Sequence, residues 1–224
     1  DNSTCANRTE GTCHRTCRQL HKCGRCNWST CYDDVAFVSQ LIHHLSATLA
    51  VDKTKVFAVG ESNGAMLIHH LAQELPGVFA AVAPVFGSPL LGYLVGSRYQ
   101  LVTEAGRAGR TSVLQLHDRF DATIPWQGGD TVDGWIYESM NRTLGVWAAL
   151  HGCAGNPVRV STKYDGGSKN LRCSTYPMCS HGQVMRCKYD GGHGDWPDQP
   201  QADHLIWEFF KNSTHAGELT SILL

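Results

Sequence analysis

Ser62 stands at the centre of Gly60-Glu61-Ser62-Asn63-Gly64, a G-x-S-x-G motif. The motif follows VFAV, a β-favouring run, and opens AMLIHHLAQEL, a helical pattern. Glycines at a sharp strand-to-helix turn let a serine hold a strained conformation with its hydroxyl exposed. Because helix N-termini favour negative charge, the Asn63 amide is expected to be one oxyanion donor. The context predicts a nucleophilic serine; an ordinary strand-to-helix turn is the alternative.

A serine nucleophile needs a base, and the base needs an orienting acid. Asp121 lies in LHDRFDATIP, just past the predicted strand SVLQLH, where the loops of an open α/β sheet gather. Asp118, three residues earlier, is the rival acid. His193 lies in the glycine-rich segment YDGGHGDWP after the last predicted strand. Hydrolases whose nucleophile lies in a strand–turn–helix motif have their serine, acid and histidine in this order along the chain. We therefore predict a triad of Ser62, Asp121 and His193.

Four further residues are weaker candidates for the same site. His117 is expected to line the site without taking part in catalysis. Trp126, Trp135 and Trp196 could line an apolar acyl pocket, although core packing explains each of them at least as well. The histidines on the predicted helices, at positions 43, 44, 69 and 70, are expected to be surface or hydrogen-bonded core residues.

Composition limits the classes of function. The 224 residues fit one large domain with a sizeable core, and 42% hydrophobic with 17% charged residues is typical of a globular protein. The net charge of −1 and the scattered basic residues give no support for binding nucleic acid. No apolar run approaches the roughly 20 residues of a membrane-spanning helix, so no membrane insertion is expected. The predicted chemistry needs no cofactor and no metal.

Ten cysteines and five N-x-S/T sequons favour a secreted, disulfide-bonded glycoprotein. Each of two cysteine groups has an even number, as expected if each forms its own disulfides. The Cys23-Gly24-Arg25-Cys26 spacing also fits a redox or zinc site, but no second C-x-x-C follows, and structural disulfides are favoured. The cysteines are Cys5, Cys13, Cys17, Cys23, Cys26 and Cys31, then Cys153, Cys173, Cys179 and Cys187; the sequons are at Asn2, Asn7, Asn27, Asn141 and Asn212.

The hydrophobic pattern changes near residue 32. Residues 1–31 are polar and cysteine-rich, which predicts a disulfide-stapled segment, whereas residues 32–224 alternate between helical and strand patterns. Strands alternating with helices predict a mostly parallel sheet with helices on both faces. We expect helices over 33–49, 65–75, 138–150 and 203–211, and strands over 55–59, 79–86, 112–117 and 183–189.

From about Cys26 to Phe210 the chain resembles the polyhydroxybutyrate depolymerase-like esterases, a family of α/β-hydrolase serine esterases that includes feruloyl and acetylxylan esterases. The resemblance rests on CNW, DDVAFVSQLI, VFAVGESNGAMLIHHLAQELPGVFAAVAPVFG, LHDRFDATIPW, WAALHGC, GGHGDWP and LIWEFF, in this order and at similar spacing. It implies an α/β-hydrolase fold in which Ser62 is the nucleophile, Asp121 the acid and His193 the general base. It also implies disulfides among the four cysteines from Cys153 to Cys187, and which of them pair remains open.

Two departures from the family pattern matter. Where the family commonly has His-Gly, this chain has His117-Asp118, which adds a carboxylate near the site. Family members also have several strands before the DDVAF helix and an early HG-type loop that supplies the second oxyanion donor, and residues 1–31 do not match them. We therefore expect an upstream segment to belong with this chain, either continuous with it or as a separate chain after cleavage.

The sequence thus predicts a secreted serine esterase that acts on carboxylic esters through an acyl-enzyme on Ser62. The substrates left open are polyesters, feruloylated or acetylated polysaccharides, and small esters. The alternative is a catalytically inactive hydrolase-fold glycoprotein with a structural or assembly role, which the cysteine-rich start and the dense sequons favour. The presence of all three triad residue types favours the enzyme.

Overall fold

The computed structural model describes residues 33–91, 111–132, 135–198 and 201–213. The predicted cysteine-rich segment over 1–31 lies outside the described residues, together with its six cysteines and the sequons at Asn2, Asn7 and Asn27. The zinc or redox alternative at Cys23 and Cys26 falls in the same segment.

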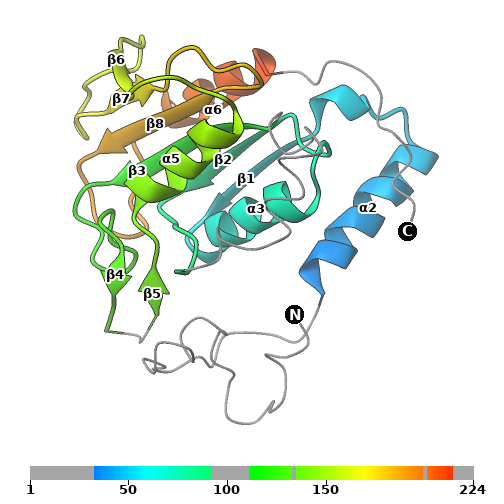
Figure 1. Ribbon diagram of the computed structural model, residues 1–224, viewed down its shortest axis with the longest axis horizontal. Helices are drawn as coiled ribbons and strands as arrows, with labels where there is room; N and C mark the ends of the chain where they lie inside the picture. Colours follow the sequence, from blue (N-terminus) through cyan, green and yellow to red (C-terminus); the bar gives the residue numbers. More distant parts are fainter. Residues whose placement is uncertain (1–32, 92–110, 133–134, 199–200, 214–224) are drawn as a thin grey trace.

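Six strands form one sheet, in the order β1-β2-β3-β8-β7-β6. The first four of these strands pair in parallel, and β7 and β6 continue the sheet antiparallel. A short antiparallel hairpin of β4 and β5 stands apart from the sheet (Figure 1). The strands are β1 (Phe57–Glu61), β2 (Ala81–Val85), β3 (Ser112–Asp118), β4 (Gly129–Asp130), β5 (Ile136–Tyr137), β6 (Val158–Val160), β7 (Arg172–Thr175) and β8 (Val184–Tyr189).

The described ranges also contain four α-helices and a short 3-10 helix. They are α2 (Asp34–Thr48), η2 (Lys53–Lys55), α3 (Asn63–Glu74), α5 (Met140–Leu150) and α6 (Gln201–Lys211). Two of the α-helices begin at a side-chain cap, because Asp33 accepts a hydrogen bond from the Ala36 amide and Ser139 accepts one from the Arg142 amide. None of the helices in the described part of the chain combines the length and the apolar character that a bilayer crossing needs.

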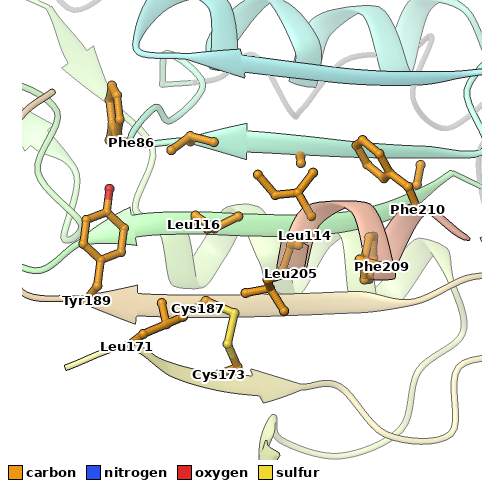
Figure 2. Packing of buried hydrophobic residues seen from close by; sticks show 14 residues of the cluster. Phe86, Leu114, Leu116, Leu171, Cys173, Cys187, Tyr189, Leu205, Phe209 and Phe210 are labelled. Atoms are coloured by element: carbon orange, nitrogen blue, oxygen red, sulfur yellow. A yellow bond between two sulfur atoms is a disulfide. The ribbon is translucent and has the colours of Figure 1, made fainter. Parts of the chain in front are cut away.

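Helices cover both faces of the sheet, as predicted. Figure 1 shows α3 and α5 on one face and α6 on the other. Successive strand residues point to opposite faces, so Val113 packs with α3 and α5 while Leu114 packs with α6. The aromatic residues of α6 complete the second layer (Figure 2). The ring of Phe210 stacks on Phe57 at 4.7 Å between centroids.

Two disulfides join cysteines of the second predicted group. Cys173 in β7 is bonded to Cys187 in β8, inside the buried layer beneath α6 (Figure 2). Cys153, which follows α5, is bonded to Cys179. The even count in this group therefore corresponds to two internal bridges.

The first strand and the first helix of the described chain are less covered than the rest. Among the described strands, β1 pairs with β2 alone, and Val59 in β1 is 48% exposed. Helix α2 has no fully buried residue, although Val35, Val38 and Ile42 pack partly buried against the core. Its other large apolar residues, Phe37, Leu41 and Leu45, are exposed. Parallel sheets are usually covered by helices on both faces, and their central strands have a neighbouring strand on each side. The part of the molecule formed by β1 and α2 is less covered than this.

The hairpin β4–β5 and the strands β6 and β7 were not predicted from the sequence. Each has two to four residues, too few to show a clear period. They are formed instead by pairing with a neighbour, as where Cys173 lies opposite Cys187 in the register of β7 and β8.

Candidate active site

Ser62 occupies a strained turn between β1 and α3. Its φ of 53° and ψ of −120° lie outside the regions that non-glycine residues ordinarily adopt. The Ser62 amide donates to the Val85 carbonyl at 3.0 Å, which extends the β1–β2 ladder to the turn itself. Asn63 is the first residue of α3, where helix amides have no acceptor within the helix. This is the geometry expected of a nucleophile elbow with the Asn63 amide close by.

Two glycines permit the turn by close backbone approach. A Cβ on Gly60 would meet the Gly64 carbonyl oxygen at 2.6 Å, and a Cβ on Gly87 would meet the Ser62 carbonyl oxygen at 2.3 Å. Both contacts are shorter than side chains tolerate, so these positions require glycine. Gly64 differs, because a Cβ there would meet nothing within 4 Å beyond its own helix backbone. The crowding expected at both glycines of the motif therefore holds at Gly60 only.

The structure brings Ser62, His193 and Asp121 into one hydrogen-bonded series. The Ser62 Oγ lies 2.9 Å from Nε2 of His193, and Nδ1 of His193 lies 2.9 Å from Oδ2 of Asp121. With a carboxylate at Nδ1, the imidazole carries its proton there, which leaves Nε2 to accept the serine proton. Ser62 and His193 are 131 positions apart in the sequence, and Asp121 and His193 are 72 positions apart, so only the tertiary fold brings them together.

Asp121 is held by the loop that follows β3. Its Oδ1 accepts hydrogen bonds from the amides of Thr123 and Ile124, at 2.8 and 2.7 Å. Burial raises the pKa of Asp121, but hydrogen bonds from His117, His193 and the Ile124 amide outweigh it and hold the pKa below its usual range. Asp121 is therefore a buried carboxylate that stays charged and leaves Oδ2 for His193.

The loop that carries His193 is fixed at several points. The Tyr189 hydroxyl donates to the Asp195 carbonyl at 2.7 Å, and the Gly192 amide donates to the Asp195 carboxylate at 2.9 Å. The Trp196 indole donates to Oε2 of Glu61 at 2.8 Å, which ties this loop to the elbow. Two positions thus link the two motifs directly: Glu61 inside G-x-S-x-G and Trp196 beside the histidine.

Phe86 is a site residue that the sequence did not single out. It ends β2 with a φ of 35° and presents its ring edge-on to the His193 imidazole, 5.4 Å between centroids. Its ring also meets Trp196 edge-on at 6.0 Å. Phe86 lies in a run of buried apolar residues, which is a pattern that core packing explains without any role at a site. The hydrogen bond between Trp196 and Glu61 was not predicted either, because only the fold shows that these two distant residues lie side by side.

Asp118, the rival acid, lies at the end of β3 with no exposed surface. Neither of its carboxylate oxygens has a hydrogen-bond partner among the described residues. Burial, and after it the nearby charge of Asp121, raise the pKa of Asp118 to about 6. His193 contacts Asp121 rather than Asp118, so the geometry favours Asp121 as the orienting acid.

His117 lies behind Asp121 and is also fully buried. Its Nε2 is 2.8 Å from the Ile124 carbonyl oxygen and 3.5 Å from Oδ2 of Asp121. The expectation that His117 lines the substrate pocket is therefore wrong, because no surface of its side chain is accessible. It supports the loop that carries the acid.

Within the described ranges, His117, Asp118 and Asp121 form one group with metal-compatible spacing, their ligand atoms lying within 4.8 Å of one another. Two of the three are already engaged in hydrogen bonds, since Nε2 of His117 faces the Ile124 carbonyl and Asp121 accepts from two amides and His193. The contacts explain the group as hydrogen-bonded support for the triad.

The three tryptophans separate into two environments. Trp126 and Trp135 are 4% and 3% exposed and pack in the core, so the pocket role is wrong for these two. The Lys188 ammonium lies 3.8 Å from the Trp126 ring centroid, and burial together with Arg186 and Arg119 lowers the pKa of Lys188 to about 8. Trp196 is half-buried beside Phe86 and remains a candidate for the pocket wall.

The helical histidines have the structural roles expected of them where the structure describes their contacts. His69 is buried, with Nε2 3.0 Å from Oε1 of Gln115 and Nδ1 accepting a hydrogen bond from the Trp147 indole. Burial lowers the pKa of His69 to about 4. His43 and His44 are exposed on α2. Among the sequon asparagines, Asn141 and Asn212 are exposed.

Known proteins with similar sequences are esterases. Feruloyl esterase C of Emericella nidulans is 26% identical over 181 residues, covering 80% of this chain and 57% of that protein. Feruloyl esterase B of Piromyces equi is 25% identical over 191 residues, covering 80% and 31%. A probable feruloyl esterase C of Aspergillus niger is 28% identical over 181 residues, covering 80% and 57%.

The chain resembles feruloyl esterases. This similarity confirms the resemblance inferred from the motifs, although no family model matches the chain. The chain spans about half the length of the curated relatives it matches.

A solved structure shows the same fold. An acetyl xylan esterase from Aspergillus awamori superposes with a TM-score of 0.55 at 16% identity, covering 79% of this chain and 66% of that one. The mostly parallel sheet with helices on both faces is therefore an α/β-hydrolase-like fold, as predicted.

Proposed function

We propose that this chain is the catalytic part of a serine esterase that hydrolyses carboxylic esters through an acyl-enzyme on Ser62. The observation that carries the proposal is the continuous contact from Ser62 Oγ to His193 and from His193 to Asp121, each at 2.9 Å. The strained backbone of Ser62 supports it, because strain of this kind at a nucleophile is characteristic of hydrolase elbows.

The mechanism follows from the roles of the three side chains. His193 Nε2 takes the Ser62 proton as Oγ attacks the ester carbonyl, and the Asn63 amide donates to the oxyanion. The imidazolium then protonates the departing alkoxide, which leaves as the alcohol and yields the acyl-enzyme. Water attacks next and gives its proton to His193, and collapse releases the acid and regenerates the Ser62 hydroxyl. Asp121 keeps its charge throughout and stabilises the imidazolium.

We further propose that the second oxyanion donor comes from an upstream segment of the same protein that pairs with the free edge of β1. Two features support this: β1 carries the nucleophile yet pairs with β2 alone among the described strands, and Val59 is exposed. The segment is either continuous with this chain or separated from it by cleavage. Intact mass and N-terminal sequencing of the native protein test this, and a homogeneous start at Asp1 with no companion polypeptide would exclude it.

The substrate class is proposed from the relatives. Proteins named feruloyl esterase and acetyl xylan esterase support polysaccharides that carry feruloyl or acetyl esters, with polyesters and small esters as further candidates. The half-buried Trp196 next to His193 and Phe86 supports an aromatic acyl group over an acetyl group. Two disulfides and the exposed Asn141 and Asn212 support a secreted glycoprotein.

The decisive experiment is labelling of the complete native protein with a fluorophosphonate probe, followed by peptide mapping. We expect modification at Ser62 that Ser62→Ala abolishes, together with hydrolysis of p-nitrophenyl acetate and methyl ferulate. Ser174→Ala in β7 is the matched control and keeps both. Absence of labelling in the folded wild-type protein would favour the alternative, an inactive hydrolase-fold glycoprotein in a structural or assembly role.

A further inference from the structure

Asp118 is a buried carboxylate without a structural explanation. Its side chain has no exposed surface, and neither oxygen has a hydrogen-bond partner among the described residues. Buried carboxylates in folded proteins are ordinarily hydrogen-bonded or paired, because burying an unpaired charge is costly. The roles that usually account for a buried aspartate, a helix cap or a turn anchor, are therefore missing here. Asp121, three residues later, accepts two backbone amides in its own turn.

The surroundings of Asp118 are those of the triad. Its ligand atom lies within 4.8 Å of those of His117 and Asp121. Tyr189 of β8 is directly across in the strand register, and its hydroxyl fixes the loop that carries His193. The carboxylates of Asp118, Asp121, Asp195 and Glu61 all raise the pKa of Tyr189, after burial, so this phenol stays neutral.

The neighbouring cation does not neutralise Asp118. Arg119, the next residue along the chain, pairs with Asp190 at 2.8 Å instead. The groups that can balance Asp118 with positive charge are then the imidazoles of His117 and His193, and of these only His193 takes up a proton in the proposed reaction. Asp118 thus lies beside Asp121 with an uncommitted carboxylate.

We propose that Asp118 is a positioning residue of the triad: its charge strengthens the hold of the Asp121–His193 pair on the proton that Ser62 gives up. This inference rests on the proposed esterase function. Asp118 touches neither the substrate nor Ser62, and it acts through His193. Negative charge near an imidazole favours the imidazolium form, which is the form present in both transition states of ester hydrolysis.

The titration of Asp118 gives the effect a direction. Burial and the charge of Asp121 together raise its pKa to about 6, against the opposing effect of His117 and His193. Below about pH 6 the side chain is neutral and adds nothing to His193. Above it, the two carboxylates are charged together and titrate as a coupled group with His193. The contribution of Asp118 therefore exists only on the alkaline side of this pH.

The test is an NMR titration of His193 in intact protein labelled with ¹⁵N-histidine, in the wild type, Asp118→Asn and Asp118→Glu. The His193 signal is assigned by its loss in His193→Gln. In Asp118→Asn we expect the midpoint of His193 to fall by about one pH unit, a tenfold weaker hold on the proton. Asp118→Glu keeps the midpoint near that of the wild type. Asp52→Asn, which removes one exposed carboxylate at the other end of β1, changes nothing.

Kinetics supply the second readout. The acidic limb of kcat/KM in Asp118→Asn should move to lower pH with the His193 midpoint, and kcat on the plateau should fall about tenfold, with KM unchanged. A merely structural role would change stability without moving this limb.

Two results would overturn the proposal. Coincident His193 midpoints in wild type and Asp118→Asn would remove the electrostatic link. Should Asp118→Asn not fold, the ¹³Cγ signal of Asp118 in the wild type decides, since a carboxyl that stays protonated beyond about pH 8 has no charge to offer. Neither titration needs turnover, so a failure of the esterase proposal at Ser62 is distinguishable from a failure of this one.

Discussion

Helices α6 and α2 both carry large apolar residues but lie in different environments. Helix α6 buries five residues against β2, β3 and β8, and we refer to this half of the molecule as the covered side. Helix α2 buries none, and together with the singly paired β1 it forms the open side. Phe209 on α6 is 6% exposed, whereas Phe37 on α2 is 65% exposed. An amphipathic pattern therefore predicts a helix and its apolar face, but not that anything covers this face.

The proposed triad spans the boundary between the two sides. Asp121 and His193 follow β3 and β8 on the covered side, whereas Ser62 ends β1 on the open side. Strand β2 joins them, because the Ser62 amide donates to Val85 and the Phe86 amide donates to Leu116 of β3. The Trp196–Glu61 hydrogen bond is a second link. The alignment of the nucleophile with its base thus depends on contacts that cross from one side to the other.

The largest expected difference between the sides is in side-chain truncation. Phe209→Ala should lower the free energy of unfolding by about 3–5 kcal/mol, because it leaves a cavity in a packed layer. Phe37→Ala should change it by less than about 0.5 kcal/mol, because the ring is already in water. Urea unfolding followed by circular dichroism measures both. Equal losses in the two variants would show that α2 is covered after all.

The next effect concerns the bridge that staples the covered side. The double variant Cys173→Ala/Cys187→Ala should lose about 3 kcal/mol of stability, since the bridge closes a short loop between β7 and β8. Thermal unfolding of the variant against the oxidised wild type measures the loss. Amide hydrogen exchange compares the two sides. After reduction of the bridge, the amides of β7 and β8 should exchange faster, whereas those of α2 on the open side should exchange as before. Faster exchange in α2 as well would contradict the separation of the two sides.

A smaller effect, with the opposite sign, is expected at Asp118. Its pKa rises from 3.8 to about 6 on folding, so the folded state binds the proton more tightly and loses stability as pH rises between these values. Asp118→Asn should therefore be more stable than the wild type by about 1–2 kcal/mol at pH 7.5, and equal to it below about pH 4. Urea midpoints across this range test the sign. A variant less stable at every pH would show that the carboxylate has a structural partner.

The smallest effect is local to the open side. Asp33 caps α2 through the Ala36 amide, and Asp33→Ala removes this hydrogen bond at a cost of about 1 kcal/mol. Because α2 buries no residue, it should open on its own, so its amides should exchange roughly fivefold faster in the variant. The amides of α6 should exchange as before. Equal acceleration in α2 and α6 would mean that α2 unfolds only with the whole domain.

Much of this fold was predictable from periodicity and turn residues. The helices around α2, α3, α5 and α6 and the strands around β1, β2, β3 and β8 were predicted to within a few residues of their ends. Their patterns are long enough to show a period. The short strands β6 and β7 were not predicted, because β7 depends on pairing with β8, and β6 on pairing with β7, rather than on their own residues.

The site was predictable in part. The motif around Ser62 predicted the turn that carries the serine. The order of acid and histidine along the chain predicted candidates for the orienting acid and the general base. The sequence could not decide between Asp118 and Asp121 as the acid, because the two residues are only three positions apart. It depends on which carboxylate oxygen His193 reaches. The roles of His117 and Trp126 were wrongly predicted for the same reason, because burial is a property of the whole fold.

The sequence by itself determined the longer helices and strands, the strained serine turn with its essential Gly60, and the residue types that could relay a proton. These depend on interactions within a few residues of the chain, which local spacing records. The tertiary structure alone decided that Asp121 is hydrogen-bonded to His193 and that Asp118 is buried without a hydrogen-bond partner among the described residues. It also decided that the Phe86 ring meets both the His193 imidazole and the Trp196 ring. These contacts join residues that are far apart in the chain, so they exist only once the strands have paired and brought their ends together.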